Sequence, residues 1–457
     1  MKKYLVRFVL GGALALVFVW NAFISGVPFL DRLDDYVYDV KVRLFAANKL
    51  DDRVVIVDID ERSLAEEGRW PWGRDKVAEL VRLLVDNYKV KVIGFDVVFA
   101  EPDISSGIDV LDRLSQQQLR ENAAFQSLYR SLRPGLDHDR IFANVLKTRP
   151  VVLGYYFNQA ENRRYGLLPY PSFSEGGAFT GKRIDFIKNK GYGANLAIFQ
   201  EAAVSAGHFN PDPDSDGTTR RVAMLVEYEG NYYESLSLAV FRRWVGNLAV
   251  RPVIPDAEGG IEWLELRSEK GSWRIPVNNR VAALVPYRGG EGSFPYVSAT
   301  DVLKGKVSQQ LLADKIVLVG TRAPGLNDLR ATPVSGIYPG VEIHANMIAG
   351  IMDNKIKQQP DYVKALDALQ ILLAGSVLVF LLPLLSPLRA SLVALATLIG
   401  IVSANLFFWH AANLNMPMAG VLLLSLILYG IDAAWGYFVE SRTKRQFTDL
   451  FGQYVPP

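Results

Sequence analysis

Charged side chains are missing from long stretches near both ends of the chain, whereas the middle mixes apolar and charged residues. No charge lies between Arg7 and Asp31, and the apolar run of residues 8–30 would rise roughly 35 Å as a helix, enough to cross a bilayer. Further charge-free stretches cover residues 368–388 and 390–431, and the second is long enough for two helices. The pattern predicts four transmembrane α-helices, one before and three after a long middle region.

Basic residues gather at the connections that would share one side of the membrane. They are Lys2, Lys3, Arg7, Arg389, Arg442, Lys444 and Arg445. The turn at residues 413–417, on the other side, carries no charge, as the positive-inside rule expects. Both termini are therefore expected inside and residues of about 31–362 outside. A cleaved signal peptide would also begin with basic residues, but its apolar segment would be shorter and would end at a small-residue cleavage site.

The middle region alternates short apolar runs with amphipathic segments. Residues 54–60, VVIVDID, form a β-branched run typical of a buried parallel strand, and residues 90–99 form a second one. Between them, residues 74–88 place apolar side chains at the spacing of a helix with one buried face. A further strand is expected at residues 316–319, before a helix that opens near Pro339. This succession predicts an α/β domain with a central, largely parallel sheet.

The segment between the first membrane helix and this domain predicts an amphipathic helix with Leu33, Val37, Val40 and Leu44 on one face. It is expected to continue the membrane helix outward as a stalk. The predicted boundaries are residues 1–30 (cytoplasmic N-terminus and first membrane helix), 31–53 (stalk), 54–362 (α/β domain), 363–388, 389–412 and 416–438 (the other membrane helices) and 439–457 (a cytoplasmic coupling segment).

Composition excludes several function classes. The net charge is +2, which gives no reason to expect nucleic acid as a partner. The absence of cysteine excludes disulfides, thiolate metal sites and cysteine nucleophiles. The histidines are far apart in the sequence and have no acid or second histidine at ligand spacing, so zinc is not expected. The sequence also lacks a phosphate-binding loop, a kinase catalytic loop and a nucleophile elbow, so no catalytic residue and no cofactor are assigned within it.

Three carboxylates lie at or near the ends of the predicted parallel strands. Asp58 and Asp60 end the first strand, and Asp96 lies in the second. Because α/β sheets tend to bind ligands at this edge, the three are candidate ligand-binding residues for a cation or a polar molecule. The favoured alternative is that they cap turns or helices and pair with Arg74 or Arg322, which we include among the candidates.

The segment WPWGR at residues 70–74 is a second candidate. Trp72 would form an aromatic lid with the basic Arg74 beneath it if the segment faces a ligand. More often such a segment packs as a rigid start to a helix, because Pro71 restricts the backbone and both indoles bury large areas.

The segment DPDSDG carries Asp212, Asp214 and Asp216 at the spacing that opens a calcium loop. Such a loop needs a bidentate acid at its twelfth position, which is Ala223 here. A turn stabilised by aspartate side chains is therefore the favoured interpretation, and a metal site at these residues is only a weak possibility.

Several ordered blocks between about Val54 and Ile351 resemble the second class of CHASE domains, which are extracellular sensory domains of bacterial receptors. These blocks are SLAEEGRWPWGRDKVAELVRLL, KVIGFDVVFAEPD, GHFNPDPDSDGTTRRVAMLVEYEGNYYESLSLAV, YRGGEGSFPYVSATDVLKG and KIVLVGTRAPGLNDLRATPVSGIYPGVEIHAN. One membrane helix before the sensor and three after it also match the family. The resemblance implies a multi-pass receptor of the bacterial plasma (inner) membrane, with a periplasmic or extracellular sensor and an unknown external ligand or protein partner.

Four residues near the C-terminus are candidates for coupling. Asp432 lies in the last predicted membrane helix, where a carboxylate is costly and often functional, although near the interface it can also reach water. Phe447, Phe451 and Tyr454 share one face of a helix that continues into the cytoplasm. This face would pack between two copies of the chain or lie against membrane lipid, and both interpretations stay open.

The ending LFGQYVPP resembles the junction before the catalytic domain of class III nucleotide cyclases that carry this sensor. That resemblance implies a homodimeric receptor adenylate cyclase, whose catalytic domain would follow Pro457 and convert ATP to cyclic AMP and pyrophosphate with magnesium or manganese. A receptor histidine or serine/threonine kinase with the same sensor is the first alternative. A non-enzymatic membrane binding or assembly protein is the second.

Overall fold

The computed structural model describes residues 2–24, 27–161, 163–174, 176–255, 259–269, 271–323 and 328–452. At residues 2–4, 24 and 439–452 the description covers the helical backbone alone. The chain divides into two compact units. We call Met1–Lys41 together with Lys357–Pro457 the membrane unit, and Val42–Ile356 the α/β unit.

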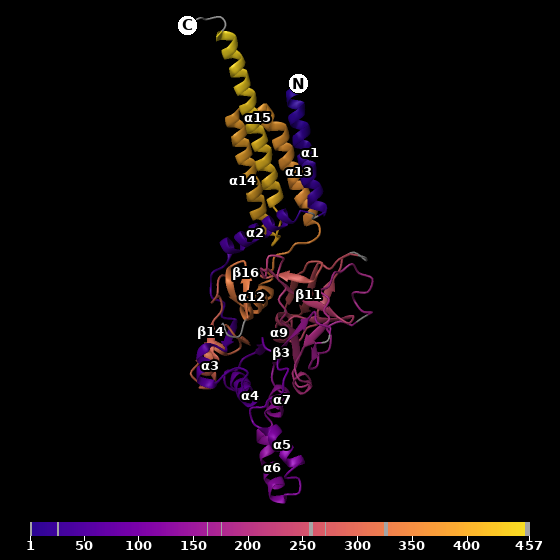
Figure 1. Ribbon diagram of the computed structural model, residues 1–457, viewed down its shortest axis with the longest axis vertical. Helices are drawn as coiled ribbons and strands as arrows, with labels where there is room; N and C mark the ends of the chain where they lie inside the picture. Colours follow the sequence, from indigo (N-terminus) through magenta and orange to yellow (C-terminus); the bar gives the residue numbers. More distant parts are fainter. Residues whose placement is uncertain are drawn as a thin grey trace. The chain divides into compact units, whose positions relative to one another are not determined.

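The membrane unit is a bundle of long helices that run side by side (Figure 1). They are α1 (Lys2–Ile24), α13 (Val363–Leu381) with its 3₁₀ extension η3 (Leu382–Leu384), α14 (Pro387–Ala411) and α15 (Ala419–Gly452). The stretches long and apolar enough to cross a membrane are Leu5–Phe23, Val363–Leu384, Pro387–Ala411 and Ala419–Phe438. The four predicted apolar helices are confirmed, while their orientation in a membrane stays a prediction.

Small residues bring α1 close to α13. A Cβ atom on Gly11 would lie 2.9 Å from Val379 Cγ2, and one on Gly375 would lie 3.2 Å from the Cβ of Ala15. In a bilayer, where apolar side chains gain little by leaving lipid, such close backbone packing is a main source of helix association. Larger side chains at these glycines would push the two helices apart.

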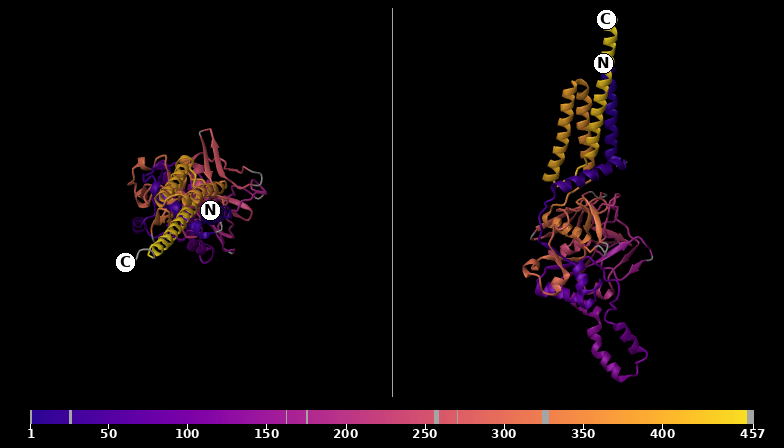
Figure 2. Two further views of the ribbon diagram at one scale, coloured as in Figure 1. Left: turned by 90° about the horizontal axis from the view of Figure 1, so that it is seen from above. Right: turned by 60° about the vertical axis from the view of Figure 1, so that its left-hand side comes forward.

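Helix α2 (Pro28–Phe45) differs from the stalk expected over residues 31–53. It runs at an angle to α1 instead of continuing it (Figures 1 and 2). Asp34 accepts two backbone N–H groups at the start of α15, both at 2.8 Å, and buried Lys41 donates to two asparagine side chains at 3.2 and 2.9 Å. Leu44, on the face predicted to be packed, is 70% exposed. Polar contacts, which apolar periodicity does not register, therefore hold α2 against the bundle.

The α/β unit is built on a sheet in which β14, β1, β15, β2, β3 and β6 pair in parallel, in that order. These strands are β1 (Val54–Asp58), β2 (Val92–Phe95), β3 (Val151–Asn158), β6 (Ser205–His208), β14 (Tyr296–Ser298) and β15 (Ile316–Gly320). Beyond them, β5 (Gly191–Gly193) pairs antiparallel with β3, and β4 (Arg164–Tyr165) pairs with β5. The predicted central, largely parallel sheet is confirmed.

Helices cover both faces of this sheet. On one face, α4 (Arg74–Arg82), which continues as the π-helical turn η1 (Leu83–Asn87), and α7 (His138–Leu146) pack with alternate strand residues in the main core. On the other face lie α9 (Leu236–Trp244) and α12 (Gly340–Asp353). A Cβ atom on Gly94 of β2 would lie only 2.6 Å from Val240 of α9, so glycine there allows the close approach of helix and strand.

Shorter elements surround these layers. The helices are α3 (Glu61–Glu67), α8 (Ala197–Gln200), α10 (Ala299–Leu303) and α11 (Gln309–Leu312). The paired strands are β7 (Arg221–Ala223) with β13 (Ala282–Leu284), β8 (Leu225–Tyr228) with β9 (Asn231–Glu234), β10 (Arg251–Val253) with β11 (Trp263–Ser268) and β12 (Gly271–Pro276), and β16 (Leu329–Thr332) with β17 (Ser335–Pro339). A hairpin of α5 (Ile108–Gln116) and α6 (Ala123–Leu136) projects from the unit without a buried residue (Figure 1).

Candidate functional site

Asp58, at the carboxyl end of β1, is held by Arg322. Its buried carboxylate accepts the Arg322 backbone N–H at 3.1 Å and Nε at 2.6 Å. The guanidinium also lies 4.8 Å from the ring of Tyr296. Burial raises the pKa of Asp58, and its bonds and ion pair with Arg322 oppose that rise. The contacts favour the predicted alternative in which Asp58 pairs with Arg322.

The next three candidates also have partners within the chain. Asp60 caps α3 by accepting the backbone N–H of Ser63 at 2.7 Å. Trp72 is buried, and its indole N–H donates to the Gly68 carbonyl at 2.8 Å. Buried Arg74 donates to the Trp72 carbonyl at 3.0 Å, with its guanidinium 4.9 Å from the ring of Phe99. These contacts favour packing and capping as the roles of the three residues.

The aspartates of the DPDSDG segment are paired with arginines. Asp214 and Asp216 lie 3.0 and 2.9 Å from buried Arg220, and Asp212 lies 3.2 Å from Arg280. Asp216 also accepts the backbone N–H two residues further on, at 2.9 Å. Arginine therefore supplies the positive charge, and the contacts favour the turn over a cation site.

Asp96, directly after β2, lies in a buried cluster of ionisable groups. His344 Nε2 of α12 is 3.9 Å from its carboxylate, and a cavity of about 20 Å³ beside them is also lined by Asp328 and Arg330. Burial raises the pKa of Asp96 well above its ordinary value and raises the pKa of Asp328 to about 6. A polar cavity of this size can hold a single water molecule.

Sequence reasoning missed the histidines of this edge. His344 and His208 are remote in sequence from Asp96, so no spacing motif links them. His208, at the end of β6, is fully buried, and neither ring nitrogen has a hydrogen-bond partner among the described residues. Burial lowers the pKa of His208 to about 3 and that of His344 to about 4. Both imidazoles are therefore neutral at physiological pH.

Replacing His208 with leucine is expected to make the α/β unit less sensitive to acid. The unfolded imidazole binds a proton below a pH of about 6.5, whereas the folded one does so only near 3, so stability falls as the pH drops between these values. Between pH 7 and 5 the variant should lose about 2 kcal/mol less stability than the natural chain. Urea unfolding of the full chain in nanodiscs, followed by tryptophan fluorescence, measures the difference.

Exposed Gln118, whose side chain does not titrate, provides the control for this experiment. Its replacement by leucine should leave the difference in unfolding free energy between pH 7 and 5 unchanged. Equal acid sensitivity of His208→Leu and the natural chain would contradict the neutral, buried state assigned to His208.

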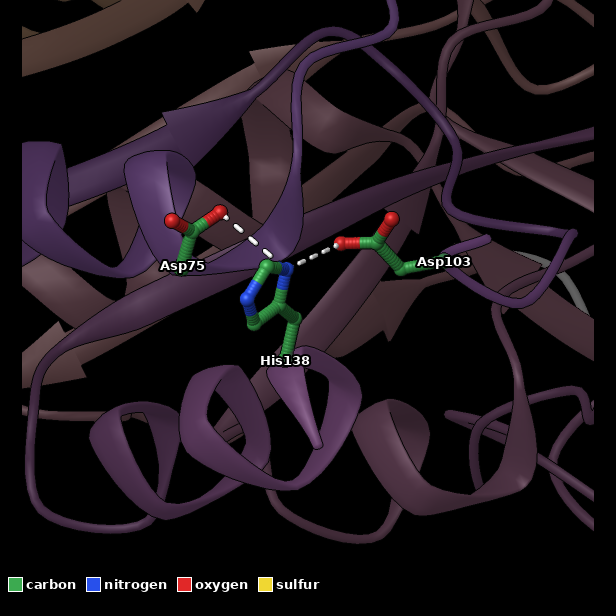
Figure 3. Close-up of side chains that lie close together, drawn as sticks. All are labelled: Asp75, Asp103 and His138. Carbon is green, nitrogen blue, oxygen red and sulfur yellow. Dashed lines mark hydrogen bonds and ion pairs between the residues drawn. The ribbon is translucent and has the colours of Figure 1, made fainter. Parts of the chain in front are cut away.

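Asp75, Asp103 and His138 meet at the base of the α5–α6 hairpin (Figure 3). His138 Nδ1 lies 3.1 Å from Asp103 Oδ2 and 3.3 Å from Asp75 Oδ1. These three residues could hold a divalent ion, and the same distances fit an Nδ1–H group shared by both carboxylates. Asp103 also accepts the first backbone N–H of α4 at 2.6 Å, so the cluster ties the hairpin to that helix. The residues are distant in sequence, and no spacing rule could have found them.

A cavity of about 650 Å³ lies in the α/β unit, between β3, β6, β9, α9 and the loop of residues 167–173. Three polar side chains on its wall, Tyr155, Gln200 and Glu234, are more than nine-tenths buried. In each, one oxygen has no hydrogen-bond partner among the described residues. Nothing in the sequence pattern reveals a void between elements, so this cavity was not predicted.

Of the coupling candidates, Asp432 has a partner within the membrane unit. Its carboxylate forms an ion pair with Arg7 of α1, and both side chains are 14% exposed. Phe447 and Phe451 lie in the last part of α15, where only the backbone is described, and Tyr454 lies outside the described residues. The coupling role of all four stays a prediction.

The fold defines a class: an α/β domain with a central, largely parallel sheet, in a chain that also carries helices of membrane-spanning length. The CHASE2 domain matches residues 13–385, so the chain belongs to the CHASE2 family. A CHASE2 sensor domain implies extracellular signal sensing in a receptor. Searches among curated proteins and among solved structures find no match.

Proposed function

We propose that this chain is the sensor and membrane part of a receptor adenylate cyclase in a bacterial plasma membrane. The observation that carries the receptor role is the CHASE2 match over residues 13–385, which includes the whole α/β unit. The cyclase output is supported by the resemblance of LFGQYVPP to the junction before class III cyclase domains. Magnesium or manganese would serve that domain, and we assign none of its ligands within this chain.

Helix α15 is the proposed route from the membrane to the output. It runs over 34 residues from Ala419 to Gly452 and continues past Phe438, the last residue of its apolar stretch. A continuous helix can transmit a rotation or a shift of the membrane bundle to whatever follows it. Its ion pair with α1 would make the two helices move together.

An external ligand would act by favouring one of two arrangements of a homodimer. It can do so only as far as it binds one arrangement more tightly than the other. To shift the two arrangements from about 1:99 to about 99:1, the ligand must bind the favoured arrangement roughly 10⁴-fold more tightly, which is a difference of about 5.5 kcal/mol in binding free energy.

ATP cyclisation by membranes that contain the gene product, expressed with all of its downstream coding sequence, tests the proposal. We expect cyclic AMP and pyrophosphate to form with magnesium or manganese. Membranes that form no cyclic AMP with either ion would overturn the cyclase assignment. Transfer of phosphate from ATP to the protein itself would instead identify the kinase alternative.

A further inference from the structure

The large cavity of the α/β unit has the size and rigidity of a preformed ligand site. Its volume of about 650 Å³ lies within the range of small-molecule sites. The loop of residues 167–173 that forms one wall is fixed at both ends. Leu167 donates its N–H to the Asn195 carbonyl at 2.8 Å, and Ser172 donates to the Tyr232 carbonyl at 2.8 Å. The free-energy cost of ordering this wall on ligand binding would therefore be small.

Three buried oxygen atoms on the wall are available as hydrogen-bond acceptors. Glu234 Oε2 and Gln200 Oε1 can only accept, and Tyr155 Oη can accept as well as donate. Tyr155 is 0%, Glu234 6% and Gln200 8% exposed, and these three oxygens have no partner among the described residues. Because a buried polar atom without a partner is costly, a group rich in N–H or O–H donors should bind here.

The charge of the site favours a cation over an anion. Arg242 already gives Nη1 to Glu234 Oε1 at 2.6 Å and Nε to the Leu248 carbonyl at 2.8 Å. The second carboxylate oxygen of Glu234 stays available. An anionic ligand would place its own hydrogen-bond acceptors next to this oxygen, and the two would repel each other. A hydrogen bond that involves an ionised group is about twice as strong as one between neutral groups, and an ammonium donor adds ionic attraction to the Glu234 carboxylate.

Aromatic rings on the cavity wall suit the same kind of ligand. Tyr155, Tyr233 and Phe173 line the cavity, and Tyr170, which also lines it, is 99% exposed between two prolines. The faces of aromatic rings attract ammonium groups and pack well against an apolar body. A carboxylate beside several rings is thus complementary to an amphipathic amine.

We propose that this cavity is the ligand site of the sensor and that it binds a small organic ammonium compound, whose N–H groups donate to Glu234, Gln200 and Tyr155. The assignment rests on the proposed receptor function only for its biological meaning. Binding itself is measured without any output. Failure of ATP cyclisation would therefore leave the binding result intact, and failure of binding would leave the cyclase result intact.

Calorimetric titration of the full chain in nanodiscs with matched probes tests the proposal. The ammonium probes are 2-phenylethylamine, ethanolamine and spermidine. The controls for the first are 3-phenylpropanoate and 2-phenylethanol, which have a similar shape but carry an anionic and a neutral group in place of the ammonium. We expect at least one ammonium probe to bind saturably, and the phenylethyl amine to bind about tenfold more tightly than its carboxylate and alcohol counterparts. Absence of saturable binding by all three amines at millimolar concentration, or equal binding of the anionic probe, would overturn the proposal.

Substitutions locate the binding in the cavity. Glu234→Gln keeps an acceptor for Arg242 and should weaken binding of the amine about tenfold. Glu201→Gln, the same change at an exposed residue of the cavity rim, should alter affinity less than twofold. If Glu234→Gln fails to fold, Tyr155→Phe removes a hydroxyl without a partner among the described residues and should weaken binding about threefold. Unchanged affinity in the folded Glu234 or Tyr155 variant would contradict the site.

Discussion

Reversing either charge of the Arg7–Asp432 pair, by Arg7→Asp or Asp432→Arg, is expected to lower the yield of folded chain in the membrane at least tenfold. The two side chains join α1 to α15 and are each only 14% exposed. A single reversal would leave two like charges facing each other in the helix bundle. Removing one partner of a buried ion pair costs about 3–5 kcal/mol, and the repulsion between two like charges adds to that cost.

The double reversal separates this explanation from a general effect of substitution. Arg7→Asp with Asp432→Arg restores an ion pair between the same helices and should recover most of the folded yield. Arg389→Gln, which removes an exposed charge in the first turn of α14, should leave the yield unchanged. Size-exclusion chromatography of the solubilised chain measures the folded fraction. Normal folding of both single reversals, or failure of the double reversal to recover any yield, would show that the pair does not hold α1 to α15.

The membrane helices and the parallel character of the sheet could be predicted because each depends on local composition. A charge-free run such as residues 8–30 is long enough to span a bilayer whatever it packs against. VVIVD at residues 54–58 is apolar on both faces, as expected for a strand covered on both sides. The order of the strands in the sheet could not be predicted, because β15 lies between β1 and β2 although it comes far later in the chain.

The direction of α2 shows a different limit of pattern reasoning. Its apolar spacing predicted a packed face that includes Leu44, yet this residue is exposed and Lys41 is buried. The hydrogen bonds of Lys41 and Asp34 decide its placement. Burial lowers the pKa of Lys41 to about 8, with Lys357 adding to the fall and Asp34 opposing it. Such contacts join residues hundreds of positions apart, so the local sequence carries no sign of them.

Some of the candidate sites could be predicted from local sequence, and others could not. Asp58, Asp60 and Asp96 were found because the carboxyl ends of parallel strands can be read from the sequence. Asp58 and Asp60 have partners of the kind the alternative interpretation named, and Asp96 lies in a buried cluster. The cavity lined by Tyr155 and Glu234 is bounded by segments from five parts of the chain. A void between packed elements has no sequence signature, and only the geometry reveals it.

The α/β unit is expected to face the outside, and the connection between α13 and α14 is expected to face the cytoplasm. Because the chain has no cysteine, single cysteines placed at exposed Gln118 in the α5–α6 hairpin and at exposed Ser386 between α13 and α14 report their side unambiguously. We expect a membrane-impermeant maleimide to label Gln118→Cys in intact spheroplasts and to label Ser386→Cys only after the membrane is permeabilised. Labelling of Ser386→Cys in intact spheroplasts, with Gln118→Cys protected, would contradict an extracytoplasmic sensor.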